Sequence, residues 1–176
     1  MNSERTQIAR KTTSAPMRWI VDNVYLSKFG DVLHFGEGKA FKDTAALERS
    51  GSRAFAYDPG SPDIVKRDRS IIDPARGMYA VGVSIYVFNT LLPSERVDAF
   101  WDMLSCCQRC VIAVRTDKVE GTPHPLTPGV ITKRGTFQTQ LNADQWQAWF
   151  LRVSPEWASV DVLHKTSAYV IIGVKR

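Results

Sequence analysis

The sequence has few cysteines, and all three lie close together, at positions 106, 107 and 110. A disulfide-rich secreted domain needs more cysteines, spread more widely along the chain. Cys107 and Cys110 have the CxxC spacing of zinc ligands, but no second ligand pair follows them, so a tetrahedral zinc site lacks half its ligands. We therefore expect reduced structural thiols and no metal site.

The sequence also lacks an apolar segment long enough to span a bilayer. Its longest apolar run, residues 78–88, is interrupted by Gly82 and Ser84 and is shorter than the roughly 20 residues that a membrane helix requires. The N-terminal stretch MNSERTQIARKTTS is polar and contains no apolar signal-peptide core. These absences predict a soluble, cytoplasmic protein with no membrane partner.

No dense block of positive charge is present beyond Lys66-Arg67-Asp68-Arg69, which is typical of a solvated surface. The formal net charge of +5 permits an anionic partner such as nucleic acid but does not demonstrate one. With 44% apolar and 23% charged residues, the 176-residue chain has the composition of one globular domain. We expect a flexible arm at 1–13 and a single domain at 14–176.

Periodic apolar patterns predict alternating helices and strands. Buried-type strands are expected at four places, namely 31–35, 53–57, 79–91 and 110–115. Amphipathic helices are expected to begin near four capping or proline positions, namely Ser14, Asp43, Pro93 and Asn142, with the first one ending at Gly30. Three tryptophans on the apolar helix faces are expected in the core, namely Trp101, Trp146 and Trp149.

The remaining segments complete the predicted fold. Residues 59–78 are rich in proline and glycine and favour no long element. Residues 117–140 are expected to form a long loop, whose Lys118, Lys133, Arg134 and Phe137 could contact phosphates and a base or could simply be solvated. Two final runs, 159–164 and 168–174, predict an antiparallel hairpin. The order predicts an α/β fold with a mostly parallel sheet covered by helices on both faces.

A glycine turn and an acid carry the first functional signal. Gly36 and Gly38 follow the first strand, where glycines let the backbone turn tightly and approach a ligand. Asp58 ends the second strand at the spacing at which an acid accepts hydrogen bonds from ribose hydroxyls. Together they indicate a nucleoside-type ligand; separately, a plain βα turn and a turn-initiating Asp-Pro would explain them.

On these residues the chain resembles the class I S-adenosylmethionine (SAM) dependent methyltransferases, and more closely the small phage-type and DNA-modification-associated members. The resembling stretches cover most of residues 31–150, namely FGEGKAFKDT (35–44), AYDP (56–59), IYVFNTLLPSER (85–96), VIAVRTDKVEG (111–121) and GVITKRGTFQTQL (129–141). The resemblance implies an abbreviated Rossmann-like methyltransferase fold, SAM as the cofactor, and methyl transfer to an acceptor that could be nucleic acid.

The resemblance also implies roles for individual residues. The cofactor would be bound by residues in or just after the first, second and third expected strands, namely His34, Gly36, Gly38, Lys39, Asp58, Pro59, Tyr86 and Val87. The catalytic residues on the acceptor side would be Asn89, Arg115 and Asp117. From its own setting, His34 is expected to be a buried, hydrogen-bonded histidine and not a catalytic base.

The sequence departs from the family pattern in ways that support a second hypothesis. His34 stands where the family has an acid, Ala40 stands where it has a third glycine, and 59–78 leaves little room for its third strand and preceding helix. The Pro-Pro-aromatic motif of amino-methylating DNA enzymes does not follow Asn89. The alternative is a non-catalytic methyltransferase-like binding or scaffold protein, which a collapsed glycine turn or a filled ribose site near Asp58 would favour.

Overall fold

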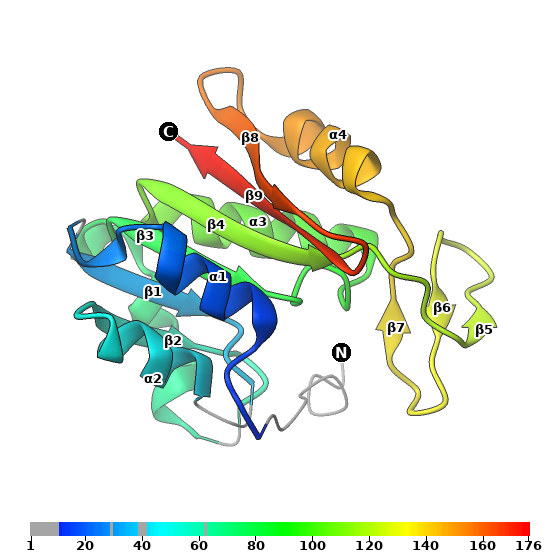
Figure 1. Cartoon of the computed structure of the whole chain (residues 1–176), viewed down its shortest axis with the longest axis horizontal. Coiled ribbons are helices and arrows are strands. Elements are labelled where there is room, and N and C mark those ends of the chain that lie inside the picture. The colour runs from blue at the N-terminus through cyan, green and yellow to red at the C-terminus, as the bar shows by residue number, and fades with distance from the viewer. Residues whose placement is uncertain (1–10, 29, 39–41, 62) are drawn as a thin grey trace.

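A six-stranded sheet forms the centre of the protein, in the order β2-β1-β3-β4-β9-β8 (Figure 1). The structure is a computed structural model that describes residues 11–28, 30–38, 42–61 and 63–176. The strands β1 (Asp31–Phe35), β2 (Arg53–Tyr57), β3 (Val81–Ile85) and β4 (Arg109–Arg115) pair in parallel. β8 (Ser159–Lys165) and β9 (Tyr169–Lys175) form an antiparallel hairpin, and β9 also pairs antiparallel with β4. The expected α/β fold is confirmed.

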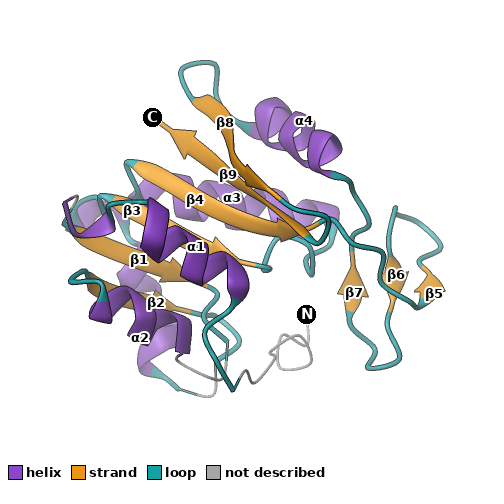
Figure 2. Cartoon of the chain, viewed as in Figure 1, coloured by secondary structure: helices purple, strands orange, loops and turns teal. Residues whose placement is uncertain are grey.

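Helices cover both faces of this sheet (Figure 2). One face packs against α1 (Ala15–Asn23) and α2 (Lys42–Arg49), and the other against α3 (Pro93–Cys106) and α4 (Ala143–Val153). β1 shows the division, because Val32 belongs to the first core and Leu33 to the second, as alternate residues of a strand must. Within the described ranges, no helix combines the length and the apolar character that crossing a membrane requires.

Capping side chains explain where α1 and α2 begin and how they join. The Ser14 hydroxyl accepts a hydrogen bond from the Met17 N–H, as the sequence predicted for an N-cap. Ser14 in turn donates its own N–H and O–H to the carboxylate of Asp43, at 2.8 and 2.7 Å. The prediction that α1 continues to Gly30 is wrong, because the helix ends at Asn23 and a separate turn, η2 (Leu26–Lys28), follows. The side-chain amide of Asn23 donates a hydrogen bond to the Trp19 carbonyl in the last turn of the helix.

The strand expected at 79–91 is much shorter than predicted. β3 stops at Ile85, and Tyr86 adopts a left-handed conformation with φ of 61° that cannot continue a strand. Val87 and Phe88 belong to a turn, and Phe88 is fully buried there. Their apolar character produced a strand-like pattern in a segment that is a buried loop.

The segment between β2 and β3 contains three short 3₁₀ turns in place of a strand. They are η3 (Val65–Arg67), η4 (Arg69–Ile72) and η5 (Pro74–Arg76). Among the described residues no strand pairs with the outer side of β2, so β2 forms the edge of the sheet. The expectation that 59–78 has no long element is confirmed.

Residues 117–140 are not the plain loop that the sequence predicted. They form a small antiparallel sheet of three two-residue strands, β5 (Thr122–Pro123), β6 (Val130–Ile131) and β7 (Phe137–Gln138), beside the end of β4 (Figure 1). Strands this short, separated by prolines and glycines, leave no periodic pattern in the sequence. We call residues 118–140 the small sheet.

Only two of the three tryptophans expected in the core are buried. Trp146 and Trp149 are buried, as predicted, but Trp101 is 42% exposed. The neighbouring Phe100 occupies the core position on that side of α3 and is fully buried. The three cysteines are free and buried, as expected for structural thiols.

Candidate active site

The carboxyl ends of β1, β2, β3 and β4 meet at one edge of the sheet, where open α/β folds bind ligands. The loops that leave these four strands carry the predicted functional residues. The structure places His34, Gly36, Gly38, Asp58, Pro59, Tyr86, Val87, Asn89, Arg115 and Asp117 in or beside those loops. Lys39 lies outside the described residues.

The glycine turn after β1 is held by its neighbours. Gly36 has φ of 77° and Gly38 has φ of 76°, in the left-handed region that favours glycine. The Gly36 N–H donates to the Tyr57 carbonyl at 2.6 Å, which joins the turn to the end of β2. A Cβ atom on Gly36 would lie 2.2 Å from Cγ2 of Val87, so this glycine is also required by the side chain that follows β3.

Asp58 joins the glycine turn to the loop after β2. Its carboxylate is buried, accepting one hydrogen bond from the Gly38 N–H at 2.8 Å and another from the Gly60 N–H at 2.9 Å. A carboxylate oxygen can accept more than one hydrogen bond, so a ribose hydroxyl can share these oxygens with the backbone. Pro59 is exposed in the turn that follows and makes the expected Asp-Pro turn.

An ion pair between Glu37 and Lys66 lies beside Asp58. The Glu37 side chain is fully buried and that of Lys66 is 9% exposed. The carbonyl of Lys66 also accepts the N–H of Asp58 at 2.9 Å. Nothing in the sequence predicted this pair, because Lys66 stands in the charged run that is typical of a solvated surface. The position of Glu37 between the two glycines was the only available signal.

His34 is a buried, hydrogen-bonded histidine, as expected from its setting. Its Nδ1 lies 2.6 Å from the Thr44 hydroxyl, which connects β1 to the first turns of α2. Burial lowers the pKa of His34, and the nearby carboxylates of Glu37 and Asp43 oppose this effect only partly. The imidazole is therefore neutral at neutral pH. Its contact with a cofactor stays a prediction from the resemblance.

The loop after β3 is strained at its first residue and buried at its end. Tyr86 is the non-glycine residue with positive φ within the described ranges, and such conformations concentrate at functional sites. Asn89 is 1% exposed and donates from Nδ2 to Oε1 of Gln138 at 2.7 Å. Its Oδ1 is buried with no hydrogen-bond partner.

Arg96 connects the loop after β3 to the small sheet through hydrogen bonds. It is 4% exposed and donates to the carbonyls of Phe88 and Leu91, at 2.8 and 2.9 Å, and to the hydroxyl of Thr139. Its guanidinium also lies over the rings of Trp146 and Trp149. Burial lowers the pKa of Arg96 to about 10, so it remains charged at neutral pH. The sequence did not indicate this role, because nothing marks a buried arginine within an amphipathic helix.

Arg115 and Asp117 bind each other at the end of β4. Nε of Arg115 donates to Oδ1 of Asp117 at 2.9 Å, and Nη2 donates to Oδ2. The hydrogen bonds from Arg115 lower the pKa of Asp117. A carboxylate with a lowered pKa is a poor proton acceptor, so this pair is suited to orienting an acceptor and not to removing its proton.

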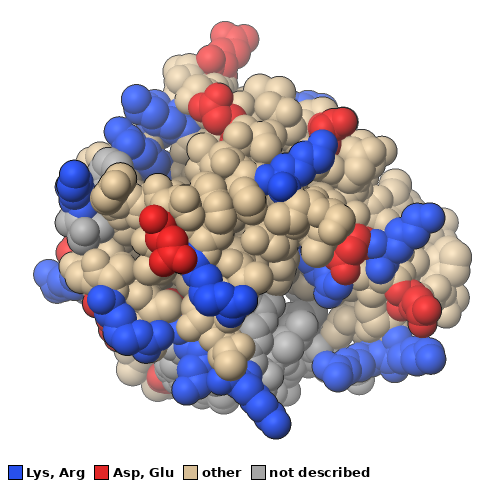
Figure 3. All heavy atoms as spheres, in the orientation of Figure 1, with Lys and Arg blue, Asp and Glu red and all other residues tan. Residues whose placement is uncertain are grey.

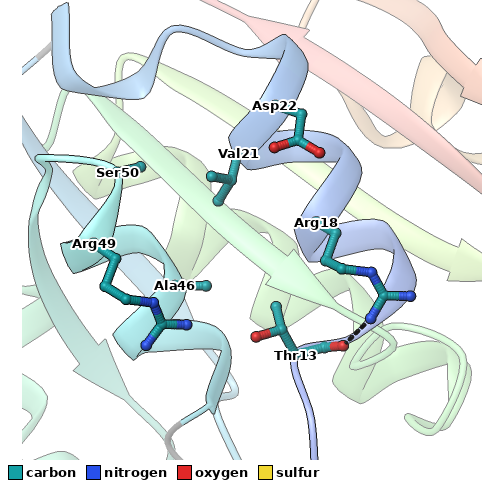
Figure 4. Close-up of a pocket in the computed structure, with 7 residues that line it drawn as sticks. All are labelled: Thr13, Arg18, Val21, Asp22, Ala46, Arg49 and Ser50. Carbon is teal, nitrogen blue, oxygen red and sulfur yellow. Dashed lines mark hydrogen bonds between the residues drawn. The ribbon is translucent and has the colours of Figure 1, made fainter.

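Two further findings concern sites elsewhere in the described chain. No group of three or more His, Cys, Asp or Glu side chains within it is placed to hold a metal ion. A hollow of about 330 Å³ lies between α1 and α2, with Arg18 and Arg49 on opposite sides (Figure 4). None of the residues predicted for the cofactor lines this hollow.

Comparison with known proteins gives a likeness in fold but not in sequence. No protein-family model matches the chain, and no curated protein matches it. The mitomycin 7-O-methyltransferase MmcR superposes with a TM-score of 0.61 at 11% identity, over 92% of this chain and 53% of that one. The Burkholderia thailandensis 1,6-didemethyltoxoflavin-N1-methyltransferase, solved with S-adenosylhomocysteine (SAH), gives 0.60 at 14% identity, over 92% and 78%.

A third structure agrees with these two. The N-terminal domain of EvdMO1, solved with SAH, superposes with a TM-score of 0.59 at 13% identity, over 94% of this chain and 82% of that one. The fold is therefore that of the class I SAM-dependent methyltransferases. The chain spans about half the length of MmcR, and at these identities the likeness establishes the fold alone.

Proposed function

We propose that the protein is a small SAM-dependent methyltransferase. The observation that carries this proposal is the junction of Gly38 with Asp58, which sets a left-handed glycine turn and a buried carboxylate side by side at the carboxyl edge of a methyltransferase-type sheet. Two of the three structures compared above were solved with SAH, which supports the same ligand for this chain.

The residues present fit SAM in their chemistry. SAM is a cation whose ammonium, amino and hydroxyl groups are hydrogen-bond donors. Two buried acceptors in the loops after β1 and β3, Oε1 of Glu37 and Oδ1 of Asn89, have no hydrogen-bond partner, and such atoms are costly unless a ligand or water completes them. The glycine turn would lie beside the methionine part of SAM, and Asp58 would hold its ribose. Tyr86 and Val87 would line the cofactor pocket.

Bound SAM supplies an electrophilic methyl group on a sulfonium. The contribution of the chain would be alignment, because holding two reactants in the right geometry removes much of the barrier to transfer. Asn89 is fixed through Gln138, and the Arg115–Asp117 pair presents a rigid planar group at the end of β4. These side chains would orient the acceptor and exclude water.

We propose nucleic acid as the acceptor class. The small sheet carries three exposed cations, Lys118, Lys133 and Arg134, and one acid, Glu120. Figure 3 shows Lys and Arg side chains at the lower right of the molecule, where Figure 1 places this sheet. The resemblance to DNA-modification-associated members favours the same class. MmcR and the toxoflavin enzyme bear the names of small acceptors, so a small molecule is the competing outcome.

A second candidate function is a non-catalytic methyltransferase-like binding protein. The same Gly38–Asp58 hydrogen bond favours it, because the Gly38 N–H already occupies the Asp58 carboxylate. A ribose hydroxyl would have to share the carboxylate oxygen with this N–H or displace it. The buried Glu37–Lys66 pair next to the acid is a further obstacle that a ligand would meet.

Calorimetric titration with SAM and SAH separates the two candidates. A methyltransferase is expected to bind SAH and to gain thermal stability with it, since a ligand that binds only the folded state stabilises that state. Asp58→Ala should abolish binding, and the exposed Asp161→Ala should leave it unchanged. No binding at millimolar ligand would refute the proposal. Transfer of labelled methyl from SAM to DNA, RNA or small molecules would then identify the acceptor.

A further inference from the structure

Lys66 is a buried lysine in a segment of exposed charges. It lies in η3 and is 7% exposed, whereas the next three residues, Arg67, Asp68 and Arg69, are exposed. A lysine is rarely buried unless its charge is paired. Its partner, Glu37, is the residue between the two glycines of the turn, and the Glu37 side chain is fully buried.

Both ends of Lys66 contact the proposed cofactor site. The ammonium pairs with Glu37 in the turn after β1, and the carbonyl accepts the N–H of Asp58 after β2 at 2.9 Å. Asp58 closes the arrangement by accepting the N–H of Gly38 at 2.8 Å. One residue of η3 thus connects the two loops that would hold the methionine and ribose parts of SAM.

The position of η3 in the fold explains why such a connection is needed. β2 is the edge of the described sheet, so no further strand supports the loop that carries Asp58. The segment that occupies this side consists of short 3₁₀ turns, whose hydrogen bonding is weaker than that of a strand or a longer helix. The hydrogen bond from Gly36 to Tyr57 already joins the glycine turn to the end of β2. The buried ion pair between this segment and the glycine turn adds a second support, on the side of β2 that no strand covers.

We infer that Lys66 is a positioning residue for SAM: it sets the spacing between the glycine turn and Asp58 through Glu37, without itself binding the cofactor. This inference rests on the proposed function. The inference makes a specific claim about SAH affinity. If Lys66 merely filled the site, its side chain would weaken SAH binding; if Lys66 is a positioning residue, its side chain strengthens SAH binding.

The test measures SAH affinity by calorimetry at a temperature well below the unfolding transition of every variant. Lys66→Met is expected to weaken SAH binding by about tenfold or more. Lys66→Arg, which keeps the charge, should restore part of the affinity. The matched control is Lys165→Met, which removes the exposed Lys165–Asp144 pair and should leave affinity unchanged.

A double variant keeps the test informative if Lys66→Met unfolds. Glu37→Gln with Lys66→Met removes both charges of this ion pair, and it should fold while still binding SAH about tenfold more weakly than wild type. Unchanged or tighter SAH binding by either variant, with normal binding by wild type, overturns the inference alone. Absence of SAH binding by the wild-type protein overturns the proposed function and the inference with it.

Discussion

The backbone N–H of Gly38 donates to the carboxylate of Asp58 over 2.8 Å, so the turn after β1 and the acid after β2 form one unit. A second hydrogen bond, from the Gly60 N–H, holds the other carboxylate oxygen. The acid that the sequence assigned to a ribose is thus also a structural part of the loop that it belongs to.

Replacing Asp58 should therefore affect both stability and ligand binding. Asp58→Asn keeps the shape but has one acceptor oxygen in place of two, so one of the two charge-assisted hydrogen bonds is weakened and the other is lost. We expect a loss of about 1–3 kcal/mol in the free energy of unfolding. Urea denaturation measures this loss. SAH affinity should fall by more than tenfold in the same variant, since a neutral amide is a poorer acceptor for a ribose diol. Unchanged stability would show that the two hydrogen bonds contribute nothing.

Gly36 is expected to be intolerant of any side chain. Gly36→Ala combines a left-handed φ of 77° with a contact of 2.2 Å to Val87, and it should destabilise by about 2–4 kcal/mol. Gly77→Ala is the matched control, because Gly77 also has positive φ but a Cβ there meets nothing within 4 Å. Thermal denaturation should give Gly77→Ala a clearly higher melting temperature than Gly36→Ala. Val87→Ala should partly rescue Gly36→Ala; failure to do so would contradict the role of the contact.

His34 should make the protein sensitive to mild acid. Its folded pKa lies below the usual value of 6.5, so the unfolded state binds more protons as the pH falls through that value. The stability that a neutral His34 provides is present above about pH 6.5 and is lost below it, with a slope of at most about 1.4 kcal/mol per pH unit. Denaturation curves between pH 7.5 and pH 5 measure the slope. His34→Asn should flatten it, and parallel curves for the two proteins would disprove the assignment.

Arg96 should control the attachment of the small sheet. Arg96→Met leaves the carbonyls of Phe88 and Leu91 without their donor, and it should destabilise by about 2–4 kcal/mol. Limited proteolysis should cut residues 118–140 faster in this variant. The exposed Arg134→Met serves as the control and should be cut at the wild-type rate. Equal protection in both variants would mean that Arg96 does not hold the small sheet.

The cations of the small sheet test the acceptor class. If they contact phosphates, Lys133→Ala with Arg134→Ala should lower the slope of log affinity against log salt by about two for double-stranded DNA. Binding curves at several salt concentrations measure this slope. Lys175→Ala, in the exposed last residue of β9, is the control. A slope that is unchanged, or no binding to DNA or RNA, would favour a small-molecule acceptor.

Much of the fold was predictable because its signals are local. β1 and β2 match the predicted strands residue for residue, and Asn142 caps the start of α4 as expected. Predictions failed where burial came from tertiary contacts: Phe88 is buried in a loop, and Trp101 is exposed beside Phe100. In both cases the apolar residues do form the pattern that the prediction used. Whether such a residue is buried, and in which element, depends on contacts with residues distant in the chain.

The candidate site shows the same division. The strand-turn-acid order located Gly36, Gly38 and Asp58 at one edge, because parallel strands end together. Glu37, Lys66 and Arg96 could not be found in this way, since pairing between loops far apart in the chain leaves no spacing rule in the sequence. The long loop likewise concealed three strands too short to have a period.

The position of β2 at the edge of the sheet also bears on how the protein avoids self-association. An uncovered strand is a template on which another molecule can add its own strand and start an aggregate. β2 is only five residues long, begins with an arginine whose side chain is 75% exposed, and is followed directly by Asp58-Pro59. Shortness, a charge and a proline are the features by which natural sheets protect such a border. The edge strand that brings Asp58 to the site is thus also built against unwanted pairing.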